Sequence, residues 1–168
     1  MKNLFKNGFT LIEITFVTGV VTSLSVGVYT AAMQRGKIVD CLNNLKQIYQ
    51  AIVMFQQDND SLPNIKFFPS SYSDEKGIHN VLSSYGIRGK ILFCPSLPDQ
   101  LNIYGTNYIW NDNVNGKRLE NIHSSIWLLT EVVAVSKKIP PPHSGMYSVI
   151  YTDGRATTEP KVNIPQGD

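Results

Sequence analysis

The sequence predicts an α+β fold in which one long N-terminal helix packs on a small antiparallel sheet. The chain carries no charge between Ile14 and Gln34 and no proline before Pro63, so a single helix can run through this whole region. The stretches 125–135 and 146–152 are rich in β-branched and aromatic residues, which favour strands. Asp153-Gly154 follows the second stretch, and this dipeptide is typical of a hairpin turn whose returning strand covers 155–158.

Length and composition exclude several classes of protein. The chain of 168 residues has room for one ordinary domain with its own core. An apolar content of 42% with 17% charged residues excludes a disordered chain and a coiled-coil rod along the whole length. The net charge of +2 is too small to indicate a nucleic-acid-binding domain.

The uncharged stretch from Ile14 to Gln34 has the length of a membrane-crossing helix, which needs about 20 residues. A secretory signal peptide cleaved near Ala32 is the alternative. The apolar stretch exceeds the usual length of a signal peptide's apolar region, and Glu13 stands at its start. Small and hydroxyl residues dilute the stretch, as they do where membrane helices pack closely: Thr15, Thr18, Gly19, Thr22, Ser23, Ser25 and Gly27.

Helical periodicity continues beyond the apolar stretch. Apolar residues recur at spacings of four and three, at Ile38, Leu42, Leu45, Tyr49 and Ile52. We therefore expect one helix from about Phe9 to about Asp60. Its first half suits a membrane, and its second half suits packing on a soluble head.

The residues Gly8-Phe9-Thr10-Leu11-Ile12-Glu13, preceded by Lys2 and Lys6, resemble the prepilin motif of type IV pilins and of type II secretion pseudopilins. The resemblance implies that a prepilin peptidase cleaves between Gly8 and Phe9 and that the new amino group of Phe9 is methylated. It also implies that Glu13 pairs with the N-terminal amine of a neighbouring subunit during assembly. A carboxylate in an apolar layer needs such a cationic partner.

The same resemblance divides the chain into four parts. Residues 1–8 form the leader, 9–34 the transmembrane and assembly half of the helix, 35–60 its soluble half, and 61–168 the globular head. The implied fold is pilin-like. Loss of Lys2 and Lys6 with the leader leaves 13 basic (15 minus 2) and 13 acidic side chains, so the mature chain has a formal charge of zero.

A second resemblance covers most of the chain and is to a group of pilin-like proteins with an H-x9-D-G signature. His143, Asp153 and Gly154 form that signature here, and Ser148 stands where the group commonly has Asn. The other matching segments are 41–48 (CLNNLKQI), 55–63 (FQQDNDSLP), 93–96 (FCPS) and 107–111 (NYIWN).

The two cysteines, Cys41 and Cys94, favour a disulfide over two buried thiols if the head is exported to an oxidising space. No metal site is expected, because the sequence has no C-x-x-C or H-x3-H pair and one would need His79, His123 or His143 to converge. No cofactor is expected either. Calcium would have to draw on Asp112 or Asp153, and two carboxylates fall short of the 6 to 8 oxygen ligands it takes.

His143 with Asp153 raises the possibility of acid–base catalysis, but the sequence supplies no G-x-S-x-G elbow and no P-loop. We therefore do not expect this protein to be an enzyme. We expect the His143 ring to bond to backbone at the start of a strand, and Asp153 to bond within its turn.

The expected function is that of a structural subunit in an extracytoplasmic filament of the type II secretion or type IV pilus class. A minor or tip subunit is one alternative, and a membrane-anchored binding protein that does not polymerise is another. The implied partners are copies of itself or other pilin-like subunits, the prepilin peptidase and the inner-membrane assembly machinery, with no nucleic acid. The implied location is the bacterial inner membrane with the head in the periplasm, followed by a periplasmic or cell-surface filament.

Overall fold

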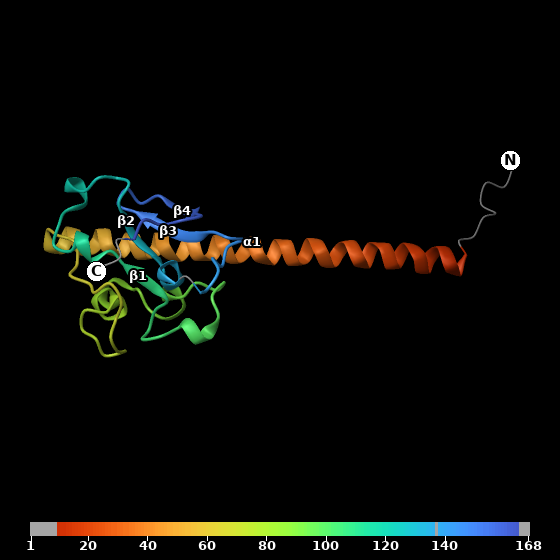
Figure 1. Cartoon of the computed structure of the whole chain (residues 1–168), viewed down its shortest axis with the longest axis horizontal. Helices are drawn as coiled ribbons and strands as arrows, with labels where there is room; N and C mark the ends of the chain where they lie inside the picture. Colours follow the sequence, from red (N-terminus) through yellow and green to blue (C-terminus); the bar gives the residue numbers. More distant parts are fainter. Residues whose placement is uncertain (1–9, 137, 165–168) are drawn as a thin grey trace. The chain divides into compact units, whose positions relative to one another are not determined.

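A computed structural model describes residues 10–136 and 138–164, except for the side chains of residues 25 and 26. The helices are α1 (Leu11–Asn59) and α2 (Ile78–Val81), and the strands are β1 (Tyr108–Trp110), β2 (Trp127–Glu131), β3 (Tyr147–Tyr151) and β4 (Ala156–Glu159) (Figure 1). Short 3-10 turns occupy η1 (Ser83–Tyr85), η2 (Gly89–Leu92), η3 (Asp99–Leu101), η4 (Asp112–Val114), η5 (Leu119–Asn121) and η6 (Val132–Val135). The chain divides into two units, 1–36 and 37–168, which are described separately below.

The expected helix from about Phe9 to about Asp60 is confirmed over Leu11–Asn59. Its start is fixed by a reciprocal capping box. The Thr10 hydroxyl accepts from the Glu13 backbone N–H at 3.3 Å, and the Glu13 carboxylate accepts from the Thr10 N–H at 2.8 Å. Its end follows from Asp60, whose φ of +59° leaves the helical region, and Pro63 stands shortly beyond.

The sheet is antiparallel with the strand order β1-β2-β3-β4, so each strand pairs with its neighbour in sequence. The hairpin between β3 and β4 is confirmed at Asp153-Gly154, where Gly154 has a φ of +80° that favours glycine. The stretch 125–135 forms a shorter strand than its composition indicates, because the chain turns into η6 after Glu131. The sequence did not predict the three-residue strand β1 as a separate element.

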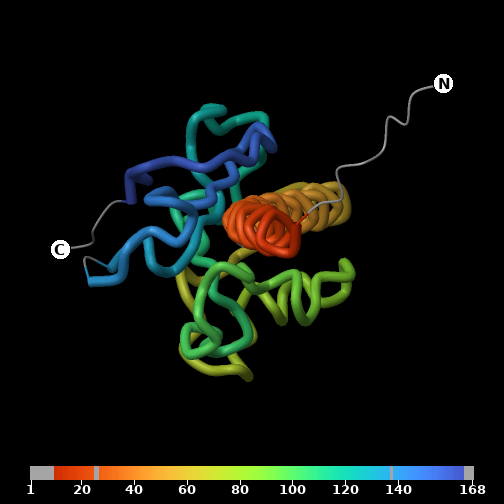
Figure 2. Tube along the Cα trace, turned by 90° about the vertical axis from the view of Figure 1, so that its right-hand side faces the viewer, coloured from red at the N-terminus to blue at the C-terminus, as the bar shows by residue number. Residues whose placement is uncertain are grey.

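The main core of the head lies between the second half of α1 and one face of the sheet. Cys41, Leu45, Ile48 and Ile52 from the helix are fully buried there with aromatic and aliphatic side chains of the strands: Tyr108, Trp110, Leu129 and Ile150. Figure 2 shows the strands (teal to blue) on one side of this part of the helix and the segment of residues 75–105 (green) on another. The α+β expectation is therefore confirmed.

A second, smaller core covers the other face of the sheet. Ile109, Trp127 and Val149 point into it from three strands, and Val162 from the C-terminal segment packs on them. Strands β1 and β2 are thus buried on both faces, which is why all of their residues are buried.

Candidate functional site

The N-terminal unit is a helical segment whose described apolar side chains are exposed. Every residue from Leu11 to Gly36 whose side chain is described is exposed, including Leu11 at 83% and Phe16 at 73%. Helix α1 contains a stretch long and apolar enough to cross a membrane. Its length and composition are thus consistent with a single membrane-spanning helix.

Five serine and threonine hydroxyl groups of this segment donate to carbonyls of the helix that carries them. Thr18 donates to the carbonyl of Ile14 at 2.6 Å, and Ser23 donates to the carbonyl of Val20 at 2.8 Å. Thr15, Thr22 and Thr30 donate in the same way to carbonyls three or four residues earlier. Because these five hydroxyls have internal partners, they present no unmet donor to an apolar surrounding.

Glu13 is the one charged residue between positions 10 and 34, and it lies in the first turn of α1. Its carboxylate accepts hydrogen bonds from both the backbone N–H and the hydroxyl of Thr10, each at 2.8 Å. A negative charge at this end of the helix is also favoured by the helix dipole. The cleavage-site residues Gly8 and Phe9 lie outside the described residues.

In the head, the Cys41–Cys94 disulfide is confirmed and links α1 to the loop that follows η2. Both cysteines are buried in the main core. The loop is held in place by two asparagines from the motif segments of the sequence. Asn44 donates to the carbonyl of Phe93 at 3.0 Å, and Asn107 accepts from the Cys94 N–H at 2.9 Å.

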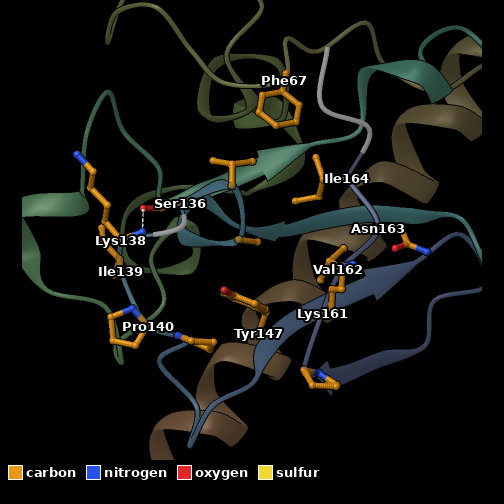
Figure 3. A pocket seen from close by; sticks show the side chains of 14 residues that line it. Phe67, Ser136, Lys138, Ile139, Pro140, Tyr147, Lys161, Val162, Asn163 and Ile164 are labelled. Atoms are coloured by element: carbon orange, nitrogen blue, oxygen red, sulfur yellow. Dashed lines mark hydrogen bonds between the residues drawn. The ribbon is translucent and has the colours of Figure 1, made fainter. Parts of the chain in front are cut away.

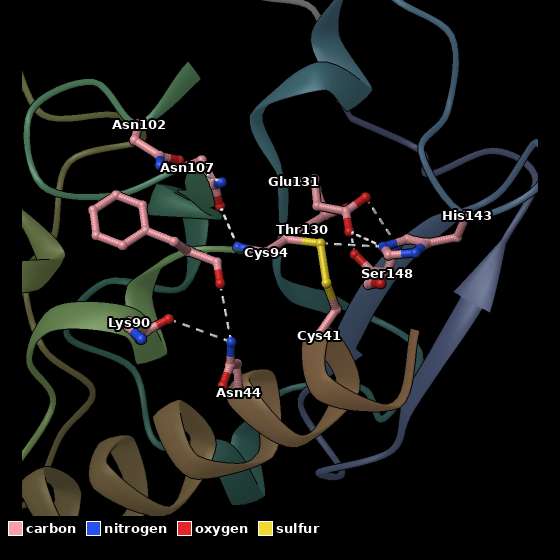
Figure 4. The surroundings of a disulfide bond; sticks show 11 residues. Cys41, Asn44, Lys90, Cys94, Asn102, Asn107, Thr130, Glu131, His143 and Ser148 are labelled. Carbon is pink, nitrogen blue, oxygen red and sulfur yellow. Dashed lines mark hydrogen bonds and ion pairs between the residues drawn. A yellow bond between two sulfur atoms is a disulfide. The ribbon is translucent and has the colours of Figure 1, made fainter. Parts of the chain in front are cut away.

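A buried acid–imidazole pair lies against this disulfide (Figure 4). The Nε2 atom of His143 is 2.6 Å from the Glu131 Oε1 atom and 3.3 Å from the Sγ atom of Cys94. Both side chains of the pair are 0% exposed. The second oxygen of Glu131 accepts from the Ser148 backbone N–H at 3.1 Å.

This pair corrects the expected partner of His143. Its ring meets a carboxylate and a sulfur, where a backbone contact was expected. Asp153 bonds within its own turn as expected, because its carboxylate accepts from the Arg155 N–H at 2.9 Å. The signature residues His143 and Asp153 therefore act separately, one in the core and one in the hairpin.

Glu131 is the site residue that sequence analysis missed. It is the one charged residue in the apolar stretch 125–135. A lone charge among apolar residues is the sequence feature that could have identified it. Its charge also acts on Tyr108, which pairs with it across β1 and β2. Burial first, and then the Glu131 carboxylate, raise the pKa of the Tyr108 phenol.

Among the described residues, one group of histidine, cysteine and acidic side chains is close enough to hold a metal ion: Cys41, Cys94, Glu131 and His143. His79 and His123 do not belong to it, since their rings lie against the Tyr72 carbonyl and the Ser125 hydroxyl, each at 2.7 Å. Asp112 and Asp153, the two carboxylates considered for calcium, do not belong to it either.

A groove of about 1000 Å³ opens on the far side of the sheet from α1 (Figure 3). The end of η6 and the segment that follows it form one wall, and the C-terminal segment 160–164 forms the other. Apolar side chains such as Phe67, Ile139 and Val162 line it together with Lys138 and Lys161.

No protein-family profile, no curated protein and no solved structure matches this chain. The family resemblance therefore rests on the sequence motifs.

Proposed function

We propose that this chain is a pilin-like structural subunit of a filament of the type II secretion or type IV pilus class. Before assembly it is held by a single helix in the bacterial inner membrane, with its head in the periplasm. The prepilin-like segment 8–13 carries the proposal. The N-terminal unit supports its membrane stage, because the described side chains of this helix are exposed and it is apolar enough to cross a membrane.

The same helical surface serves both stages of this proposal. Lipid covers the apolar side chains while the subunit is in the membrane, and neighbouring helices cover them after assembly. Small residues allow close helix approach, and a Cβ at Gly19 or Gly27 would meet nothing within 4 Å in the isolated chain. Because the serine and threonine hydroxyls bond to carbonyls of their own helix, neighbouring helices in the filament are held together by van der Waals packing.

Glu13 sets the register between subunits in this proposal. Cleavage after Gly8 by the prepilin peptidase creates a cationic amine on Phe9, next to the helix start. In an apolar layer that amine and the Glu13 carboxylate of a neighbour each need an opposite charge, so pairing favours side-by-side assembly. The contacts with Thr10 hold the carboxylate at the helix terminus, close to where that pairing takes place.

The head has a mechanical and not a catalytic role in this proposal. The disulfide ties α1 covalently to the loop at Cys94, so a pulling force on the helix is transmitted directly into the head. This suits a subunit whose helix is embedded in a filament while its head faces outward.

Mass spectrometry of the native protein tests the processing step. We expect a chain that begins at methylated Phe9. An intact leader, or a cut near Ala32, contradicts the proposal.

Substitutions at Glu13 and Thr10 separate the two roles of the carboxylate. Glu13→Gln keeps an acceptor for the Thr10 N–H but removes the charge, whereas Thr10→Val keeps the charge and removes the hydroxyl of the capping box. We expect Glu13→Gln to be processed normally and to enter filaments poorly, and Thr10→Val to assemble. If Glu13→Gln and the wild type yield equal amounts of sheared filament, Glu13 acts only as a helix cap and the pairing step is wrong.

A further inference from the structure

We propose that the reduced, dithiol form of the head binds one zinc ion through Cys41, Cys94, Glu131 and His143. The two Sγ atoms, a carboxylate oxygen of Glu131 and a ring nitrogen of His143 all lie within 4.8 Å of one another, and all four residues are buried. The proposal is independent of the filament function.

The donor set matches the chemistry of zinc. Two thiolates, one imidazole and one carboxylate give four ligands, the usual number at a structural zinc site. Tetrahedral ligands at ~2.0–2.3 Å from zinc lie roughly 3.3–3.8 Å apart. The Cys94 sulfur is 3.3 Å from His143 Nε2 in the oxidised head, and His143 Nε2 is 2.6 Å from Glu131 Oε1. Admitting the ion therefore requires the disulfide to open, its two sulfur atoms to move apart, and the Nε2 and Oε1 atoms to separate slightly.

Four separate segments hold these donors. Cys41 comes from α1, Cys94 from the loop after η2, Glu131 from the end of β2, and His143 from the connection that precedes β3. The Ser148 N–H fixes the second oxygen of Glu131, which leaves Oε1 directed at the cluster (Figure 4). Most of the site is thus formed before any ion arrives, which lowers the ordering cost of binding.

Two buried polar atoms of the cluster also lack a hydrogen-bond partner in the oxidised state. The His143 Nδ1 and Ser148 Oγ atoms are buried and have no hydrogen-bond partner among the described residues. They show that the hydrogen bonds of this buried cluster do not satisfy all of its polar atoms, although the ion itself would be held by Nε2 and not by Nδ1. An ion would in addition offset the charge of two thiolates and a carboxylate, which are costly to bury without a cation.

Zinc binding and disulfide formation exclude each other because both use the same two sulfur atoms. A phosphine reduces the disulfide in the laboratory, and with one water molecule the products are two thiols and a phosphine oxide. Zinc then displaces two protons from the thiols. The metal-bound and disulfide-bonded heads are therefore alternative states of one site.

Metal titration of the full chain in detergent tests the proposal. The protein is reduced with a phosphine, freed of reductant without oxygen, and titrated with Co²⁺, whose thiolate charge-transfer and visible bands report a tetrahedral sulfur site. We expect one Co²⁺ per reduced chain, loss of the bands when zinc is added, and no bands with the oxidised chain as matched control. A reduced chain that keeps its native tryptophan fluorescence yet takes up no metal contradicts the proposal.

Substitutions identify the ligands. We expect His143→Gln to weaken zinc binding by more than tenfold in competition with a chromophoric chelator, because changes outside the ligand shell alone cost ~10–100-fold. His123→Gln changes an exposed histidine and is expected to leave binding unchanged. Equal affinities of His143→Gln and the wild type overturn the assignment. If a reduced chain loses its fold, zinc added before reduction is expected to preserve it, and failure to do so also overturns the proposal.

Discussion

Removal of the disulfide is expected to destabilise the head by about 4 kcal/mol. The bond joins residues separated by 53 positions, and closing a loop of that length lowers the entropy of the unfolded chain by about 14 cal/mol/K. At 25 °C this corresponds to roughly 4 kcal/mol of folding stability. The double variant Cys41→Ala/Cys94→Ala removes the link and leaves no buried thiol behind.

Urea unfolding of the full chain in detergent measures this effect. Trp110 and Trp127 are both buried in the head, at 1% and 6% exposure, so their fluorescence reports its unfolding. With a urea m-value of ~2 kcal/mol/M, the midpoint is expected to fall by about 2 M. Oxidised wild-type protein is the reference, and mass spectrometry confirms its bond.

The single variants provide the sharper test. Once either cysteine is replaced the loop is open, so Cys41→Ala, Cys94→Ala and the double variant should lose similar amounts of stability. If the two single losses instead add up to the loss of the double variant, local packing dominates and the loop argument is wrong. A loss below ~1 kcal/mol refutes it as well.

Two further substitutions test local features of the head. Several hydrogen bonds, the strongest of them from Lys66, hold the pKa of Asp74 well below its usual range. The ionised Asp74 carboxylate therefore stabilises the head above about pH 4, and this stabilisation is lost as the pH falls toward the lower pKa of the folded state. We expect Asp74→Asn to be less stable than the wild type at pH 7 and the difference to shrink at pH 3 in urea unfolding, and a constant difference contradicts this. Gly154→Ala combines a φ of +80° with a Cβ 2.8 Å from a ring carbon of Tyr49, so it is expected to cost about 2 kcal/mol or more. Gly116→Ala, with a φ of +69° and open space, serves as the control for backbone strain alone, and equal losses in the two variants contradict the steric argument.

The elements with a repeating local pattern were predictable from the sequence. The long helix followed from an uninterrupted periodicity, and the β3–β4 hairpin followed from Asp153-Gly154 between strand-forming residues. Strand β1 has three residues, too few for alternation to be recognised, and it exists because it pairs with β2.

The cluster around the disulfide was predictable only in part. An even pair of cysteines indicated the bond, but nothing local to Glu131 or His143 identified them as partners. Their contact depends on the register of the sheet and on which face of β2 meets α1. Leu129 and Glu131 share that face by strand alternation, so the carboxylate lies in the same core as Cys41.

The position of the disulfide along α1 connects the fold to the proposed function. Cys41 is the first buried residue of the described part of the helix, and every described side chain before it is at least partly exposed. In the proposed filament subunit, a tension applied through the N-terminal segment therefore enters the fully buried core of the head near this residue. Noncovalent packing opens readily at the edge of a packed segment, whereas a covalent link at the first buried residue prevents the helix from separating from the core there. A covalent link at Cys41 is therefore well placed to resist such a force. The buried Glu131–His143 pair lies against the disulfide on the side of the sheet.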